Sequence, residues 1–159
     1  MSFVRPKTHR YPLVLLAAAL AFPSIARADC VLDAAKYHRV NPTILLAIAI
    51  VESRLQPRAV HKNTNGSADF GVMQINSVHL PELARYGVKR ADLYDSCKNV
   101  YTGAWILRKR LDQYGNTWAA IGAYHSATPA LRDSYAARVQ ATVRWLVDTG
   151  YAYPGDGAK

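Results

Sequence analysis

Apolar positions recur at helical spacing through most of the chain and predict a mainly helical fold. A short first helix is expected at 32–38. Asn41 followed by Pro42 combines an N-cap residue with a first-turn proline, so a second helix begins there, and Pro57 is expected to stop it. Residues 44–51 of this second helix are apolar without a break. A helix that is apolar on all sides belongs at the centre of a domain.

Four further helices are predicted downstream of this buried segment. They cover residues 80–86 with Gly87 as the stop, 95 or 96 to 114 with Gly115 beyond, 118–124, and 129–147 opened by Thr128-Pro129. Residues 58–68 are polar, with Asn63-Thr64-Asn65-Gly66 as the clearest turn. Residues 69–76 fit either a short extended piece or a tight loop. The predicted fold class is all-α, one domain, with a cleft between the buried helix and the later ones.

The N-terminus has the pattern of a secretory signal peptide, residues 1–28. Cations at positions 5, 7 and 10 precede an apolar run at 13–22 and the small-residue site Ala26-Arg27-Ala28. A membrane anchor is the alternative, although the run is far short of the roughly 20 residues that cross a bilayer. Cleavage after Ala28 predicts a domain at 29–148, a flexible Gly/Pro-rich tail at 149–159, and no stable membrane anchor afterwards.

Charge and cysteine content fit an exported protein. Four of the 20 cationic residues and none of the 11 acidic residues lie in 1–28, so the remainder carries +5. For an exported basic protein, an anionic polymer of the cell envelope is a better partner than nucleic acid, for which no recognition element is evident. Cys30 and Cys97 make an even count that favours one disulfide, with two buried thiols as the alternative.

Glu52 is the candidate catalytic residue. It follows eight apolar residues on one helix and lies near that helix's C-terminus, where the dipole disfavours negative charge. Both features favour the protonated acid, which a general acid needs near neutral pH. Two alternatives remain: Glu52 is the first exposed residue of the helix, or Arg54 or Arg58 pairs with it and keeps it ionised.

Several short motifs follow Glu52 in a recognisable order. They are Glu52-Ser53, Gly71-Val72-Met73-Gln74-Ile75, Asn99-Val100, Ala123-Tyr124-His125 and Tyr135. Between about Cys30 and Trp145, the chain resembles the lytic transglycosylases of the lysozyme-like (SLT domain) superfamily. One departure is His125, because the family usually has Asn there. The resemblance implies a lysozyme-like domain with a substrate cleft.

The resemblance also implies a reaction and its residues. Family members cleave the β-1,4 bond between N-acetylmuramic acid and N-acetylglucosamine in peptidoglycan and form a 1,6-anhydro ring. A single Glu, here Glu52, acts as acid and then base. Substrate contacts are expected from Ser53, Met73, Gln74, Tyr124, His125 and Tyr135, with Met73 as an apolar wall beside Glu52. The small size is similar to members that serve secretion, pilus or conjugation systems in the periplasm.

Two other functions remain open at this stage. A hydrolytic muramidase would need a second carboxylate to activate water, and Asp69 is the candidate. A catalytically silent scaffold that binds peptidoglycan or a secretion apparatus is the other. No cofactor or metal is expected, because neither cysteine has a ligand at metal spacing and the histidines at 61, 79 and 125 stand singly. Trp105, Trp118 and Trp145 are expected in the core.

Overall fold

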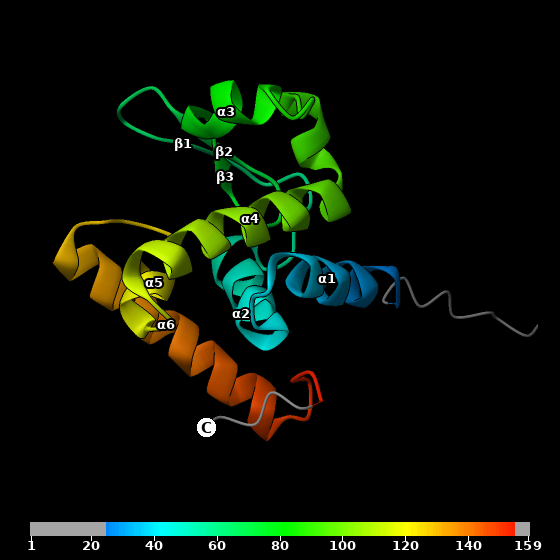
Figure 1. Cartoon of the computed structure of the whole chain (residues 1–159), viewed down its shortest axis with the longest axis vertical. Coiled ribbons are helices and arrows are strands. Elements are labelled where there is room, and N and C mark those ends of the chain that lie inside the picture. The colour runs from blue at the N-terminus through cyan, green and yellow to red at the C-terminus, as the bar shows by residue number, and fades with distance from the viewer. Residues whose placement is uncertain (1–24, 155–159) are drawn as a thin grey trace, which may run out of the picture.

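The computed structural model describes residues 25–154, and this part of the chain is predominantly helical, as predicted. The helices are α1 (Ile25–His38), α2 (Pro42–Ser53), α3 (Leu80–Ala84), α4 (Ser96–Tyr114), α5 (Trp118–Gly122) and α6 (Pro129–Asp148), with 3-10 turns at Ser77–His79 and Arg90–Tyr94. Figure 1 shows α4 crossing the molecule, with the strands and α3 on one side and α2, α5 and α6 on the other. The domain predicted at 29–148 lies almost wholly in the described part, and nearly all of the predicted signal peptide lies outside it.

Helix α2 forms the centre of the core. The Asn41 side chain accepts a hydrogen bond from the Ile44 backbone N–H at 2.8 Å, which confirms the predicted N-cap. Leu45, Ala47, Ile48 and Ala49 have no solvent exposure, as their unbroken apolar run predicted. The helix ends before Pro57, because Arg54 and Leu55 both adopt left-handed backbone conformations. This early end turns the chain out of the core directly after Glu52 and Ser53.

A small antiparallel sheet follows α2 and settles the ambiguity at residues 69–76. Strands β1 (Val60–Lys62), β2 (Ala68–Phe70) and β3 (Ile75–Asn76) pair in that order. The turn predicted at 63–66 joins β1 to β2, and Gly66 supplies its left-handed residue. The segment 69–76 is therefore extended at both ends with a tight turn between. Strands of only two or three residues leave no strong periodic pattern in the sequence.

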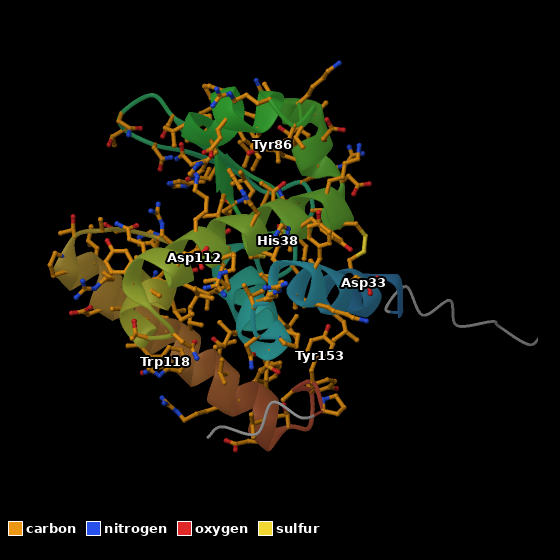
Figure 2. All side chains as sticks on the ribbon, in the orientation of Figure 1. Asp33, His38, Tyr86, Asp112, Trp118 and Tyr153 are labelled. Atoms are coloured by element: carbon orange, nitrogen blue, oxygen red, sulfur yellow. A yellow bond between two sulfur atoms is a disulfide. The ribbon has the colours of Figure 1, made fainter. Side chains whose placement is uncertain are left out.

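A disulfide links the first described helix to the middle of the chain. Cys30 in α1 and Cys97 in the first turn of α4 are bonded, with their Cα atoms 5.3 Å apart (Figure 2). The prediction of a single bridge is confirmed. Its sequence separation of 67 residues constrains a long loop in the unfolded chain. By the chain-entropy relation this contributes about 4 kcal/mol to the free energy of unfolding.

Two expectations about the core and the tail differ from the structure. Trp118 and Trp145 are 40% and 51% exposed, so these side chains lie at the surface rather than in the core; Figure 2 shows Trp118 at the edge of α5. Residues 151–153 of the predicted flexible tail pack back on the domain. The Tyr151 backbone N–H donates to Leu146 O, and that of Tyr153 donates to Thr43 Oγ1 in α2. Hydrogen bonds of this kind leave no periodic signal in the sequence.

The first helix is longer than predicted, whereas the last helix agrees with its prediction. Helix α1 begins at Ile25, ahead of the predicted start at 32 and of the proposed cleavage point, while α6 starts at Pro129 as predicted. No helix within residues 25–154 has the length and apolar character to cross a membrane.

Candidate active site

A cavity of about 730 Å³ opens between the end of α2, the small sheet, and the helices α4 and α5. Glu52 lines it from the last turn of α2. The sheet contributes polar side chains, including Asp69, and α4 contributes Ile106 and Arg110. His125, just after α5, lines it too. The helical scaffold and the sheet are therefore the two walls of one polar cleft, with the end of the core helix between them.

Burial changes the protonation of Glu52. Its pKa is raised to about 7, mainly by desolvation and in addition by the charge of the nearby Asp69 carboxylate. A hydrogen bond from Tyr135 and the charge of Arg138 act in the opposite direction. Glu52 therefore holds a proton over part of the neutral range and can also release it. One group that is populated in both states near pH 7 suits acid and base steps in turn.

The predicted charge partners of Glu52 differ from those in the structure. Arg54 and Arg58 form no ion pair with Glu52 within residues 25–154. The cation that acts on it is Arg138 of α6, which sequence reasoning missed. Arg138 lies 86 positions away in the chain, so only the packing of α6 against α2 reveals the contact.

Tyr135 holds the Glu52 carboxyl group directly. Its hydroxyl donates to Glu52 Oε1 at 2.6 Å, and its side chain is 1% exposed. Burial and the neighbouring carboxylate raise the Tyr135 pKa well above its usual range, so the hydroxyl remains a donor. The structure thus brings together two residues that the sequence motifs had placed in one site, with Tyr135 behind the carboxyl group rather than on the cavity wall.

A tight turn at 71–74 joins the two short strands beside Glu52, and Asn99 of α4 fixes it. Gly71 and Gln74 both have left-handed backbone conformations. A Cβ on Gly71 would collide with Leu93 O and with the Asn99 side chain. The Asn99 amide accepts from Met73 N at 2.7 Å and donates to Phe70 O and Leu93 O, both at 2.9 Å. Asn99, with no solvent exposure, therefore sets the shape of the turn.

Ser53 and Met73, two of the predicted substrate-binding residues, lie away from the cavity wall. The Ser53 hydroxyl donates to Val72 O at 2.8 Å and so ties the end of α2 to the turn. The Met73 side chain is fully buried and lies against Gly103 of α4, where a Cβ would come within 2.7 Å of it. Their position differs from the predicted sugar contacts and from the predicted apolar wall. Both side chains instead support the turn from behind.

Gln74, Tyr124 and His125 are three of the predicted substrate-binding residues, and all three line the cavity. Gln74 Nε2 donates to Gly71 O at 2.8 Å. The Tyr124 hydroxyl donates to Met73 O at 2.9 Å, across 51 residues of sequence. That bond joins the segment after α5 to the turn at 71–74.

Two asparagine side chains orient Asp69, and neither was predicted as a site residue. Asn63 Nδ2 donates to Asp69 Oδ2 at 2.9 Å, and Asn76 Nδ2 donates to Oδ1 at 2.7 Å. Each carboxylate oxygen therefore has its own amide donor. Asn63 was predicted only as a turn residue, so its contact with Asp69 was not expected. Asn76 lies opposite Asp69 because of the register of β2 against β3, which the sequence does not reveal.

His125 stacks on the tyrosine that holds Glu52. Its ring lies parallel to Tyr135, with centroids 4.9 Å apart and an interplanar angle of 5°. The Arg138 guanidinium lies 5.4 Å from the same tyrosine ring. Desolvation, and then the charge of Arg138, lower the His125 pKa. A neutral imidazole at this position offers one donor and one acceptor to the cleft near neutral pH.

Comparisons with known proteins match most of the chain to a family model and to several relatives. The sequence model of the family described as "Transglycosylase SLT domain" matches residues 29–142. The chain is 39% identical to "Invasion protein IagB" of Salmonella typhimurium over 126 residues, which cover 76% of this chain and 79% of the relative. It is 37% identical to "Protein IpgF" of Shigella flexneri over 107 residues, covering 67% and 70%. It is 33% identical to "Peptidoglycan-binding-like protein" of Escherichia coli O157:H7 over 129 residues, covering 76% and 77%.

Proposed function

Because the chain belongs to the transglycosylase SLT domain family, we propose that it is a peptidoglycan lytic transglycosylase with Glu52 as its catalytic acid and base. One observation carries this proposal. The Glu52 carboxyl group lies in a polar cleft, with its pKa raised by burial to about 7 and one oxygen held by Tyr135. The relative named as peptidoglycan-binding-like supports the substrate class. The family match at 29–142 supports a functional domain at 29–148.

The reaction proceeds in two steps on one carboxyl group. Glu52 first donates its proton to the glycosidic oxygen, so the bond to the leaving N-acetylglucosamine breaks. The acetamido oxygen of the N-acetylmuramic acid stabilises the positive centre that develops at C1. The Glu52 carboxylate then removes the proton of the 6-hydroxyl of the same sugar, whose oxygen attacks C1 and closes the 1,6-anhydro ring. Glu52 ends protonated, and no water is consumed.

The surrounding residues divide into substrate-contacting and positioning groups. Gln74, Tyr124 and His125 line the cleft and bind the sugars. Tyr135 orients the Glu52 carboxyl group, and Ser53 holds the turn that carries Gln74. The protein acts in the periplasm after export, as the N-terminal pattern and the disulfide support. Local opening of the wall for a secretion, pilus or conjugation apparatus is the cellular role, supported by similarity to a protein named for invasion.

Mass spectrometry of the products tests the reaction type. Muropeptides released from purified sacculi should end in 1,6-anhydro-N-acetylmuramic acid, 18 mass units below the hydrated form because water is not added. Hydrolysis is the second candidate, since Asp69 lines the same cavity as Glu52 and has both oxygens oriented. Reducing ends as the main product would favour that candidate and overturn transglycosylation. Absence of any released muropeptide would overturn both.

Replacing Tyr135 with Phe should move the pH dependence of activity. The wild-type rate falls as pH rises through about 7, because Glu52 loses the proton that it donates. The Tyr135 hydrogen bond lowers the Glu52 pKa, so its removal raises that pKa. The alkaline limb of kcat/KM should shift to higher pH by about one unit. Rates measured from pH 5 to 9 on solubilised glycan strands give the profile.

Tyr101→Phe is the matched control for this shift. Tyr101 lies on α4, is partly buried and does not line the cavity. Its variant should keep the wild-type profile. An alkaline limb in Tyr135→Phe that stays in place or moves to lower pH would contradict the role of the Tyr135 hydroxyl.

A further inference from the structure

Arg110 places a positive charge on the cleft wall formed by α4. It lines the cavity together with Ile106 of the same helix and with His79. The uncharged sugar rings of a glycan strand carry no anionic group with which a guanidinium could form an ion pair. The charge of Arg110 is therefore a feature of the cleft that sugar binding alone does not use.

The acidic residues near Arg110 are already paired with other cations. Glu82 accepts from Lys109 Nζ with both carboxylate oxygens at 2.9 Å. Asp112, labelled in Figure 2, pairs with Arg108 at 2.7 Å. Among the side chains of residues 30–154, no ion pair includes Arg110. The two neighbouring cations are neutralised within the protein, and Arg110 is left without a carboxylate.

The hydrogen-bonding groups of Arg110 are also largely unused. A guanidinium carries five N–H donors. Arg110 Nε is buried and has no hydrogen-bond partner in the described part of the chain, and NH1 reaches Gln113 Oε1 only at 3.4 Å. An arginine that lines an open cleft and has most of its N–H donors unpaired can bind a carboxylate with two parallel hydrogen bonds.

The charge of Arg110 acts on His79, another residue of the cavity lining. Desolvation lowers the His79 pKa first, and the charges of Arg110 and then Lys109 lower it further. His79 is thus neutral near pH 7 and does not add a second cation. It can instead donate or accept a hydrogen bond at the same end of the cavity. A single anionic group fits this end, with Arg110 as its charge partner.

We propose that Arg110 forms a subsite for a carboxylate on the substituent of N-acetylmuramic acid. This inference rests on the proposed peptidoglycan substrate. N-acetylmuramic acid differs from N-acetylglucosamine by its 3-O-lactyl group. Strands with peptide stems carry carboxylates on those stems, while strands without stems carry the free lactyl carboxylate. Arg110 therefore distinguishes strands that contain N-acetylmuramic acid from neutral N-acetylglucosamine polymers.

Calorimetric binding to three soluble ligands tests this subsite. The ligands are glycan fragments with peptide stems, the same fragments after amidase removal of the stems, and a neutral N-acetylglucosamine oligomer of equal length. Glu52→Gln is the background, so that the fragments stay intact. Adding Arg110→Gln should weaken binding of a carboxylate-bearing ligand at least about tenfold, the effect of losing a charged hydrogen-bonded pair. Affinity for the neutral oligomer should stay within twofold.

Lys109→Gln is the matched control, since it removes the adjacent positive charge from the same helix outside the cavity lining. Weakening with stem-bearing fragments alone assigns the stem carboxylate, and weakening with the stem-free fragments alone assigns the lactyl carboxylate. Weakening with both fragment types shows that Arg110 binds either carboxylate. Unchanged affinity for all three ligands, an equal loss with the neutral oligomer, or an equal effect of Lys109→Gln would overturn the proposal. These affinities do not depend on turnover. A protein that cleaves no glycan would therefore contradict the proposed function, while the binding comparison would still test the Arg110 subsite.

Discussion

Replacing Glu52 with Gln is expected to lower the release of muropeptides about 10³-fold or more while the fold stays intact. The amide cannot donate a proton to the glycosidic oxygen and cannot accept one from the 6-hydroxyl. A positioned general acid or base contributes roughly 10²–10⁴-fold to a rate, and here one group performs both steps. Substrate affinity should change little, because the amide has nearly the same shape as the carboxylic acid.

The same substitution should stabilise the protein in alkaline solution. The folded-state pKa of Glu52 is about 7, above its ordinary value of 4.5, so the ionised carboxylate destabilises the fold. This destabilisation begins as pH rises above the unfolded-state pKa of Glu52. It is complete above pH 7, where it lowers the free energy of unfolding by roughly 3 kcal/mol. Gln carries no charge, and its carbonyl can still accept the Tyr135 hydrogen bond. The Glu52→Gln variant therefore does not lose this stability at alkaline pH.

Two measurements separate the loss of chemistry from the loss of structure. Muropeptide release from sacculi gives the rate, and urea unfolding at pH 5 and pH 8.5 gives the free energy of unfolding. Glu82→Gln is the matched control, because that carboxylate is partly exposed and paired with Lys109 outside the cavity lining. It should retain wild-type turnover. Turnover in Glu52→Gln within tenfold of wild type would remove Glu52 from the mechanism.

The local signals in the sequence predicted the helices well and the geometry of the cleft only in part. Asn41-Pro42 and Thr128-Pro129 begin helices where expected, because capping chemistry and the fixed φ of proline act within a few residues. The unbroken apolar run of α2 predicted its central burial for the same reason. Burial raises the pKa of a carboxyl group, so the protonation of Glu52 could also be predicted from its place on that helix.

Contacts between segments that are distant in the sequence could not be predicted from these local signals. Arg138 acts on Glu52 from a helix whose register against α2 depends on packing throughout the core. Asn76 meets Asp69 only because a tight turn brings two short strands together. Met73 was predicted to form an apolar wall of the cleft, but its side chain lies in the core, where Gly103 leaves room for it. In each case the decisive information is the approach of two elements, which single-segment patterns do not contain.

Asn99→Ala is expected to lower the free energy of unfolding by about 3–5 kcal/mol. The buried amide of Asn99 satisfies one N–H and two carbonyl groups, and alanine leaves all three without their partner. Each unsatisfied buried group costs about 1–3 kcal/mol, and water entering the space left by the side chain recovers part of that sum. This total lies at the upper end of single substitutions and is a large share of the stability of a small domain.

Activity should fall together with stability in this variant, because Asn99 fixes the turn rather than contacting substrate. Tyr124 donates to Met73 O, so a displaced turn also displaces one wall of the cleft. Urea unfolding gives the stability change, and kcat/KM at a temperature where the variant remains folded gives the effect on catalysis.

Asn116→Ala is the control for this comparison, at an exposed loop position between α4 and α5 where a change of less than about 0.5 kcal/mol is expected. A loss in Asn99→Ala no larger than in the control would show that the turn keeps its shape without the amide. The shape of the cleft would then have to come from Gly71, Ser53 and the disulfide-linked helices alone. A large loss would instead show that a residue outside the cavity lining, on the middle helix, determines where Gln74 and Tyr124 stand relative to Glu52.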